Sequence, residues 1–250
     1  MRQKIIEGME QKVVTKAGLF AHGRGEAFDY LMGEKTLPSA VEAMEAAVAM
    51  MLLAKHPVIS INGNAAALVP EGMVQLGAAI GAKLEVNLFY REPGREAAIE
   101  QVLRKAGATE ILGLGDVPPA TLGNLESSRR IIDPRGIAIA DVVLVPLEDG
   151  DRTEALRKAG KKIIAIDLNP MSRTSQWAHI TICDNLLRAV PRMIKMAEAF
   201  KKEKSQKHLE AIVVKHDNAR VLSSTVKEII EFLEKVAERG VFLEIPRAVS

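Results

Sequence analysis

Ligand-capable side chains are densest in the segment Asp167-Leu168-Asn169-Pro170-Met171-Ser172-Arg173-Thr174, which follows an apolar run at 163–166. An acidic residue at the end of a core strand commonly accepts hydrogen bonds from ribose hydroxyls. The guanidinium of Arg173 is suited to neutralise phosphate charge while bonds to phosphorus form or break. The segment therefore indicates a nucleotide site, with ATP as the favoured ligand. A structural turn with an asparagine cap is the alternative interpretation.

The triplet Asn62-Gly63-Asn64 follows a second apolar run, 58–61, and precedes the helix-compatible segment 65–68. Gly63 permits a positive φ, and the two amides can bond the backbone or a ligand. Free amide groups at the start of a helix can also bind a phosphate. Anion binding and a plain Asn-Gly turn are equally favoured interpretations of this triplet.

An acidic segment, Glu148-Asp149-Gly150-Asp151-Arg152-Thr153-Glu154, follows a third apolar run. Asp151 is expected to cap the next helix, and Glu154 stands at the capping-box position. The remaining carboxylates, Glu148 and Asp149, are candidates to hold Mg²⁺ through water beside a polyphosphate.

The pair Asp184-Asn185 follows the apolar run 179–183. In a parallel sheet this pair would lie close to Asp167 if the two preceding strands were neighbours. The alternative is that the pair only caps the helix that begins at Leu186.

Outside the predicted strands, residues 21–30 concentrate His22, Arg24 and two glycines in what is expected to be one short loop. A lone histidine is more often structural than catalytic, whereas an arginine between glycines has few structural uses. Arg24 is therefore favoured over His22 as a ligand contact.

Short β-branched runs alternate with helix-length segments through the middle of the chain. The predicted strands are 58–61, 84–89, 110–114, 142–147, 163–168 and 179–183, with the clearest helices at 73–82, 95–106 and 152–159. Apolar strands separated by helices are best buried on both faces, which predicts an α/β fold with a Rossmann-like, mainly parallel sheet flanked by helices. All strands of such a sheet end on one edge, so the polar segments after them are expected to share a crevice.

The 250 residues are expected to form a single α/β domain. Its parts would be a helical N-terminal part (1–56), a core sheet (57–186) and a helical tail (187–250). The segment 118–136 has no clear period and is expected to be a long surface loop. Within the tail, 221–239 has apolar residues at helical spacing, which favours packing or dimerisation.

Charge, cysteine content and the distribution of apolar residues argue against several classes of protein. With 34 Lys+Arg against 32 Asp+Glu, the formal charge of +2 offers no broad attraction to nucleic acid or anionic lipid. Cys183 is the lone cysteine, so neither an internal disulfide nor a CxxC redox pair can form. The start of the chain lacks the apolar region of a signal peptide, and the most apolar stretch, 43–54, is too short to span a membrane. A cytoplasmic location is expected.

Several common motifs are absent, among them GxxxxGK[ST], HExxH and GxSxG. The segment Gly113-Leu114-Gly115-Asp116 lacks the remainder of a dinucleotide fingerprint, which disfavours a dehydrogenase. A non-catalytic adenine-nucleotide-binding module stays an alternative to an enzyme, because open α/β sheets host many functions.

Long motifs in one order resemble archaeal phosphopantothenate synthetase, a 4-phosphopantoate–β-alanine ligase. The motifs are 22–31, Asn62-Gly63-Asn64, Asn87-Leu88-Phe89-Tyr90-Arg91, 140–156, 167–174 and His216-Asp217-Asn218. The resemblance implies that ATP, 4-phosphopantoate and β-alanine become 4'-phosphopantothenate, AMP and diphosphate in coenzyme A synthesis, through an acyl-adenylate. It also implies a cytosolic homodimer, and Mg²⁺ is expected with the ATP.

Carried over motif by motif, the resemblance also implies a set of nucleotide contacts. These are Arg2, Arg24, Asp167, Leu168, Asn169, Arg173, Thr174, Asn185 and Leu186. Arg24 and Arg173 are expected to act as catalytic residues by neutralising phosphate charge. The site of 4-phosphopantoate is assigned to Asn62, Gly63 and Asn64 by inference, because its phosphate needs donors separate from those that hold ATP.

Overall fold

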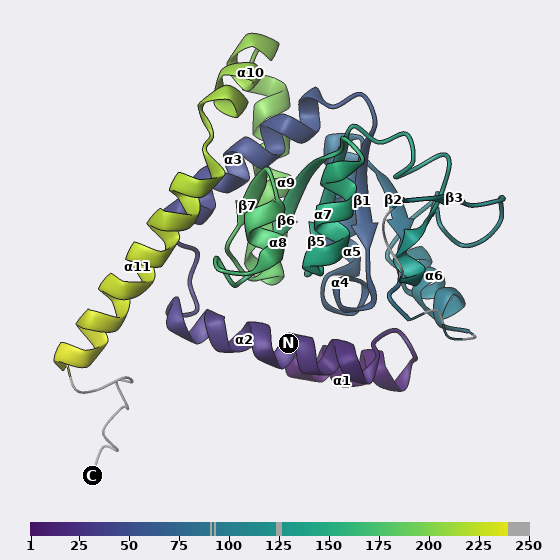
Figure 1. Cartoon of the computed structure of the whole chain (residues 1–250), viewed down its shortest axis with the longest axis horizontal. Helices are drawn as coiled ribbons and strands as arrows, with labels where there is room; N and C mark the ends of the chain where they lie inside the picture. The colour runs from purple at the N-terminus through teal and green to yellow at the C-terminus, as the bar shows by residue number, and fades with distance from the viewer. Residues whose placement is uncertain (91, 93, 124–126, 240–250) are drawn as a thin grey trace.

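The computed structural model describes residues 1–90, 92, 94–123 and 127–239, and it contains a five-stranded parallel sheet. The strands follow the order β2-β1-β5-β6-β7. They are β1 (Pro57–Ile61), β2 (Lys83–Val86), β5 (Val142–Pro146), β6 (Lys162–Ile166) and β7 (Ile180–Ile182). Helices lie on both faces of this sheet (Figure 1). The predicted Rossmann-like α/β fold is therefore confirmed.

Helices precede, separate and follow the strands. They are α1 (Arg2–Glu10), α2 (Lys16–Leu31), α3 (Pro38–Leu53), α4 (Gly63–Leu68), α5 (Pro70–Ile80), α6 (Arg95–Lys105), α7 (Gly150–Lys158), α8 (Arg173–Trp177), α9 (Leu186–Glu203), α10 (Gln206–Lys215) and α11 (Asn218–Arg239). The predicted helical beginning and helical tail are thus both present. Among the residues that the structure describes, no helix is long and apolar enough to cross a membrane.

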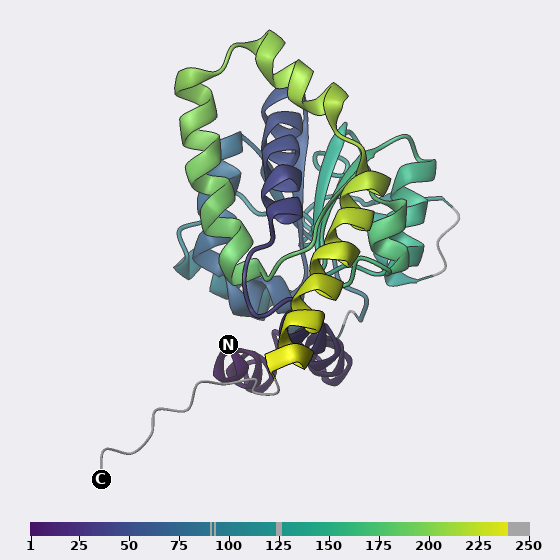
Figure 2. The same ribbon diagram turned by 90° about the vertical axis from the view of Figure 1, so that its left-hand side faces the viewer.

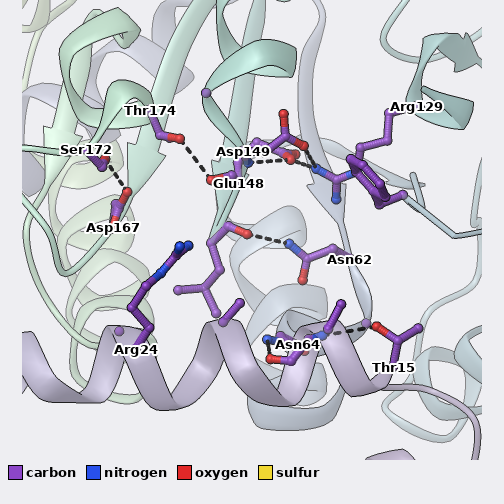
Figure 3. A pocket seen from close by; sticks show the side chains of 18 of the residues that line it. Thr15, Arg24, Asn62, Asn64, Arg129, Glu148, Asp149, Asp167, Ser172 and Thr174 are labelled. Carbon is purple, nitrogen blue, oxygen red and sulfur yellow. Dashed lines mark hydrogen bonds and ion pairs between the residues drawn. The ribbon is translucent and has the colours of Figure 1, made fainter. Parts of the chain in front are cut away.

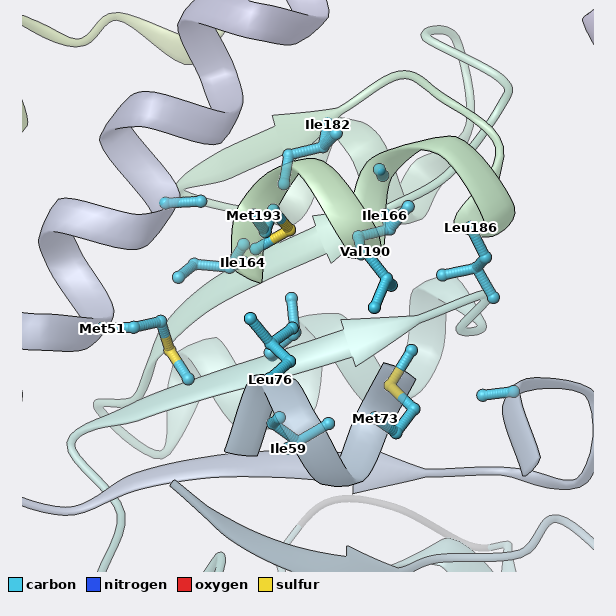
Figure 4. Packing of buried hydrophobic residues seen from close by; sticks show 14 of the residues in the cluster. Met51, Ile59, Met73, Leu76, Ile164, Ile166, Ile182, Leu186, Val190 and Met193 are labelled. Carbon is cyan, nitrogen blue, oxygen red and sulfur yellow. The ribbon is translucent and has the colours of Figure 1, made fainter. Parts of the chain in front are cut away.

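The two faces of the sheet are buried against different helices because side chains alternate along each strand. Ile59 and Ile164 belong to a large apolar cluster with residues of α3, α5 and α9, part of which Figure 4 shows. Val143 and Ile163 point to the other face and belong to a smaller cluster with Leu156 of α7. Burial on both faces explains why the central strands are almost continuously apolar.

One predicted strand is absent. The run 110–114 forms a single isolated bridge, between Leu112 and Glu85, instead of a sixth strand of the sheet. Gly113 has a φ of 80°, which interrupts the extended backbone, and its N–H donates to the carboxylate of Asp133 at 3.1 Å. The chain therefore leaves the sheet after one residue of pairing.

The segment 118–136, predicted to be a loop, contains regular structure. It forms a two-stranded antiparallel ladder and a short 3₁₀ helix: β3 (Ala120–Thr121), η1 (Ser128–Arg130) and β4 (Ile131–Ile132). Leu122 and Ile132 are buried in the smaller apolar cluster, which attaches this segment to the body of the protein. The prediction missed it because each strand is only two residues long.

The N-terminal helices α1 and α2 lie across the edge of the sheet where the strands end (Figures 1 and 2). The loop after β1 continues directly into α4, which contacts both α1 and α2. These helices therefore form a wall opposite the strand-end loops.

The side chain of Asn218 attaches the start of α11 to the edge strand β7. Its Oδ1 accepts a hydrogen bond from the N–H of Thr181 at 2.7 Å. Its Nδ2 donates to the carbonyl oxygens of Ser175 and Ala178 at 3.0 and 3.1 Å. One amide thus bonds three backbone groups and covers the edge of β7 that pairs with no further strand among the described residues.

We expect Asn218→Ala to lower the free energy of unfolding by about 2–4 kcal/mol, because it leaves buried backbone groups without partners. Urea denaturation followed by circular dichroism measures the change. Lys227→Ala, at an exposed position of the same helix, is the matched control and should change stability by less than about 0.5 kcal/mol. Equal stability of the two variants would contradict the role of Asn218.

Candidate functional site

A cavity of about 620 Å³ lies between α2 and the loops that follow β1, β2, β5 and β6 (Figure 3). Its volume is in the range of pockets that bind small molecules. The cavity collects eight of the predicted site residues, although they come from distant parts of the sequence. They are Arg24, Asn62, Gly63, Asn64, Asp167, Asn169, Arg173 and Thr174.

The position of the cavity follows from the strand order. The chain builds the sheet outward from β1 to β2 on one side and from β5 to β7 on the other. The loops after β1 and β5 therefore diverge, and ligands of open α/β sheets bind in such a crevice. The amide of Asn62 bridges its base, donating to the carbonyl oxygens of Pro146 and Leu147 at 2.7 and 3.1 Å.

The side chains of the asparagine triplet are largely occupied by the protein itself. Asn62 also caps α4, because its Oδ1 accepts from the N–H of Ala65 at 3.0 Å. Asn64 donates to the carbonyl oxygen of Gly18 in α2 at 2.9 Å. The triplet thus connects β1 to both β5 and α2, and its assignment to 4-phosphopantoate stays a prediction.

Asp167 follows β6 and is held by its own loop. Its Oδ1 accepts from the N–H of Asn169 at 2.9 Å, and its Oδ2 accepts from the hydroxyl of Ser172 at 2.6 Å. Burial raises the pKa of the Asp167 carboxyl, while the Ser172 hydrogen bond and the charge of Arg24 act in the opposite direction. The carboxyl is therefore fixed in direction and keeps lone pairs for a hydroxyl donor.

Hydrogen bonds of Ser172 and Thr174 stabilise this part of the cavity wall. Ser172 caps α8 by accepting from the N–H of Ser175 at 2.9 Å. Thr174 donates from its hydroxyl to the carbonyl oxygen of Glu148, which follows β5, at 2.9 Å. The loops after β5 and β6 are thus held as one surface.

Arg173 lies at the mouth of the cavity, where it pairs with two acids of α7. Its Nη1 lies 2.7 Å from Asp151 Oδ1, and its Nη2 lies 3.1 Å from Glu154 Oε2. These contacts raise the pKa of the Arg173 guanidinium. Its side chain is 61% exposed, and exposed pairs of this kind contribute little stability. The guanidinium can therefore exchange these partners for phosphate oxygens at small cost.

The predicted helix cap at Asp151 is wrong by two residues. Helix α7 begins at Gly150, and its cap is Asp149, whose Oδ1 accepts from the N–H of Arg152 at 2.8 Å. Asp151 lies in the first turn and Glu154 one turn later, where both face Arg173. Their role is ion pairing instead of capping.

Arg24 projects from α2 toward the cavity, on the side of Asp167 (Figure 3). The prediction of a loop for residues 21–30 is wrong, because α2 runs unbroken from Lys16 to Leu31. Thr15 supplies its cap, and the two glycines beside Arg24 are accommodated within the helix. Within the described residues Arg24 makes no hydrogen bond or ion pair, and its charge acts on Asp167 only at longer range.

Helix α2 is anchored at its far end by a buried charge network. The carboxylate of Asp29 accepts from both terminal nitrogens of Arg188, at 2.5 and 3.1 Å. Arg188 also donates from Nε to Asp184 at 2.8 Å, and Asp184 accepts from the hydroxyl of Thr36 at 2.7 Å. The network fixes the position of α2, and therefore of Arg24, against the start of α9.

The acids after β5 are paired with arginines. Glu148, with a side chain only 1% exposed, lies between the guanidiniums of Arg129 and Arg152. Asp149 pairs with the same Arg129 at 2.9 Å. Burial lowers the pKa of both arginines to about 10, so both stay charged at neutral pH. Glu148 thus serves as a counter-ion, and it does not fit the role of a metal ligand.

Four predicted contacts lie outside the cavity. Leu168 is buried beside Met32 and Leu37, and Leu186 is buried in the large apolar cluster. Asn185 caps α9, which was its alternative interpretation, and Arg2 is an exposed residue of α1. That these four residues contact a nucleotide, as the family resemblance implies, stays a prediction.

Asn185, one of the four predicted contacts outside the cavity, lies close to the first residue of the chain. Its Nδ2 donates to Asp29 at 2.9 Å and to Glu26 at 3.2 Å, and it lies 3.5 Å from the sulfur of Met1. Asn185, Leu186 and the first turn of α1 are therefore close together, at the anchored end of α2.

Sequence reasoning missed two arginines that line the cavity, Arg95 and Arg129. Arg95 opens α6 and Arg129 belongs to the short 3₁₀ helix, so neither directly follows a strand of the main sheet. Arg95 lies close in sequence to the motif 87–91, which was the only signal that could have found it.

Comparisons with known proteins identify the family. Residues 39–232 match the model of the family described as phosphopantothenate/pantothenate synthetase. A protein of Thermococcus kodakarensis named 4-phosphopantoate--beta-alanine ligase is 52% identical over 242 residues, covering 96% of this chain and 92% of the relative. A Methanosarcina mazei protein of the same name is 49% identical, covering 94% and 92%. The chain belongs to the phosphopantothenate/pantothenate synthetase family.

Membership of this synthetase family makes the protein an enzyme of the ligase class. The family match includes the loops after β1, β5 and β6, whereas Arg2 and Arg24 precede it. The alignment with the Thermococcus kodakarensis relative is long enough to include α2. The segments that form both walls of the cavity are therefore covered by that alignment.

Gly63 has no room for a side chain, because Val13 and Arg95 lie close to its Cα. A Cβ at this position would overlap the carbonyl oxygen of Val13 and lie 2.7 Å from Nη2 of Arg95. The turn between α1 and α2 and the first residue of α6 therefore meet at a point that has no room for a side chain.

We expect Gly63→Ala to lower the free energy of unfolding by about 1–3 kcal/mol, because the new methyl group must displace Val13 or Arg95. Gly23→Ala is the matched control, since its Cβ would meet nothing within 4 Å. In the interior of α2 that change should stabilise the protein by about 0.5–1 kcal/mol. Urea denaturation of both variants checks the contrast, and loss of stability in both or in neither would contradict it.

Proposed function

We propose that this enzyme uses ATP to join 4-phosphopantoate to β-alanine, giving 4'-phosphopantothenate, AMP and diphosphate for coenzyme A biosynthesis. The observation that carries the proposal is one continuous cavity that unites the Asp167 loop with the Asn62-Gly63-Asn64 triplet. Two substrates bound at these places would lie within reach of each other. The names of the relatives support the same acid and amine.

The proposed reaction has two steps. A carboxylate oxygen of 4-phosphopantoate attacks the α-phosphorus of ATP, which forms an acyl-adenylate and releases diphosphate. The amine of β-alanine then attacks the acyl carbon, forms the amide with loss of a proton, and releases AMP. Positioning and charge neutralisation are the means of catalysis, and no covalent enzyme nucleophile is needed.

The nucleotide is proposed to bind where the β6 loop faces α2. Asp167 is suited to accept from a ribose hydroxyl, because its carboxyl is fixed by Asn169 and Ser172. Arg24 and Arg173 approach the same space from α2 and α8; Arg24 has no partner among the described residues, and Arg173 can exchange its exposed acidic partners for a phosphate group. Thr174, Arg2, Leu168, Asn185 and Leu186 complete the proposed contacts.

Magnesium is proposed to enter with ATP, held by its phosphates and water. The described residues contain no group of three or more His, Cys, Asp or Glu side chains arranged to hold a metal ion. Glu148 and Asp149, the acids after β5 that line the cavity, are paired with Arg129. Mg²⁺ commonly takes only one or two protein carboxylates together with substrate phosphates and water. Entry of the ion already bound to ATP agrees with this preference.

A cytoplasmic homodimer is proposed as well. Large apolar side chains are exposed on two helices that contact each other, namely Phe20 (77%) and Tyr30 (63%) on α2 and Ile230 (49%) on α11. Exposed apolar surface of this kind is often covered by another protein. Sedimentation equilibrium tests the proposal, with twice the chain mass of 27.2 kDa expected.

We expect ATP consumption by the purified enzyme to yield AMP and diphosphate, and only when both 4-phosphopantoate and β-alanine are present. Chromatography of the nucleotides with a coupled diphosphate assay measures the products. Omission of each substrate in turn is the control. Release of ADP and phosphate would exclude the adenylate route, and nucleotide binding without turnover would favour a non-catalytic module.

We expect Arg24→Ala to lower kcat/KM by about 10²–10³-fold, because it removes a charge-assisted contact to a phosphate. Its thermal midpoint should change little, since within the described residues Arg24 has no hydrogen-bonding partner. His22→Ala, on the same helix but outside the cavity lining, is the matched control and should keep kcat/KM within about twofold. Equal activity of the two variants would remove Arg24 from the site.

A further inference from the structure

One buried cation of the cavity has no acidic partner. Arg95, the first residue of α6, is 6% exposed and lines the end of the cavity near β1 and β2. Its Nε and Nη2 donate to the carbonyl oxygen of Val13 at 3.3 and 3.2 Å, and its Nη1 donates to that of Tyr90 at 2.5 Å. Within the described residues it forms no ion pair, and Glu92 acts on it only from a longer distance.

The other buried arginines differ in this respect. Arg129 and Arg152 share Glu148, and even the half-buried Arg188 binds Asp29 and Asp184. Burying a charge without a counter-ion is costly, and here burial lowers the pKa of Arg95. Only backbone carbonyl groups compensate this guanidinium.

The hydrogen-bonding capacity of Arg95 is also incomplete. A guanidinium has five N–H groups, and the protein accepts from three of them. The two that are left belong to Nη1 and Nη2, one on each. Donors on the two terminal nitrogens of arginine can bind a phosphate through two hydrogen bonds.

The guanidinium of Arg95 lies against the β1 loop and near a second cation. Gly63 approaches Nη2 so closely that no side chain separates the β1 loop from the guanidinium. The charge of Arg95 also lowers the pKa of Arg129, so both cations act at the same end of the cavity. The charge of Arg129 is balanced by Glu148 and Asp149, whereas that of Arg95 is not.

This end lies opposite the proposed nucleotide site. Arg129, Asn64 and Thr15 appear on one side of the cavity in Figure 3, and Asp167 and Ser172 appear on the other. Arg95 belongs to the first side, because its partner Val13 is two residues from Thr15 and its neighbour Gly63 adjoins Asn64. A second phosphate group bound here would be separated from the phosphates of ATP.

We propose that Arg95 binds the phosphate of 4-phosphopantoate and thereby makes the enzyme prefer this substrate to unphosphorylated pantoate. The inference rests on the proposed function, which supplies the substrate. Its physical basis is a buried guanidinium without an ion-pair partner among the described residues, which keeps two N–H groups beyond its bonds to Val13 and Tyr90 and belongs to a residue that lines the cavity on the side away from the nucleotide loop. A dianionic phosphate supplies the missing counter-charge, whereas the hydroxyl of pantoate does not.

The test compares two acids in steady-state assays of the full-length enzyme. With Arg95→Gln, kcat/KM for 4-phosphopantoate should fall about 100-fold, as expected for loss of a buried charge-assisted contact. The value for pantoate and the KM for ATP should stay within about threefold, so the preference for the phosphorylated acid is lost. Arg95→Lys keeps the positive charge but lacks the paired donors of the guanidinium, and its kcat/KM for 4-phosphopantoate should fall about 10-fold. Arg104→Gln, on the exposed part of the same helix, is the control and should match wild type.

Calorimetric titration with 4-phosphopantoate and with ATP separates binding from turnover. Only the Kd for 4-phosphopantoate should weaken in the Arg95 variants. Equal losses with 4-phosphopantoate and pantoate, or a weakened Kd for ATP, would show a structural or nucleotide role and overturn the inference. If Arg95→Gln does not fold, Arg95→Lys supplies the same comparison. A wild-type enzyme inactive with all three substrates would overturn the proposed function, whereas an active wild type with unchanged preference in the variants would overturn the inference alone.

Discussion

The divergence of the chain after β1 and β5 is the constraint on which the rest of the molecule depends. These two strands are neighbours in the sheet, yet the loops that follow them run to opposite sides. A crevice is left between them, and unpaired backbone groups at its base must find partners. The amide of Asn62 provides them by bonding Pro146 and Leu147 while it caps α4. The proposed substrate contacts that line the cavity are arranged around this bridge.

Charge is distributed unevenly around the crevice. Arg129 and Arg152 are compensated by Glu148 and Asp149, so these two acids are engaged in ion pairs and are not free to bind a metal ion. Arg173 is compensated only by exposed acids, and Arg24 and Arg95 have no ion-pair partner within the described residues. The cations that lack a strong internal partner are therefore those best suited to bind anionic substrates. The proposed reaction, which brings together ATP and a second phosphate ester, would use such cations at both ends of the cavity.

Helix α2 closes the cavity from outside the sheet. The charge network of Asp29, Arg188 and Asp184 fixes one end of this helix, and the hydrogen bond from Asn64 to Gly18 fixes the other. Arg24 lies between these two attachments and faces Asp167. The helical beginning of the chain thus contributes directly to the site, although it adds no strand to the fold.

The sequence alone determined the parallel α/β fold, because alternation of apolar runs and helical segments is a local pattern that burial on both faces requires. It also located the loops at Asp167 and Asn62, since polar residues that end core strands are recognisable along the chain. Only the tertiary structure decided that residues 21–30 are helical and that Asp149, not Asp151, caps α7. It alone brought Arg95 and Arg129 to the cavity. Their roles depend on which charges lie within a few ångströms after folding, and such proximity between residues distant in sequence leaves no periodic or local signal.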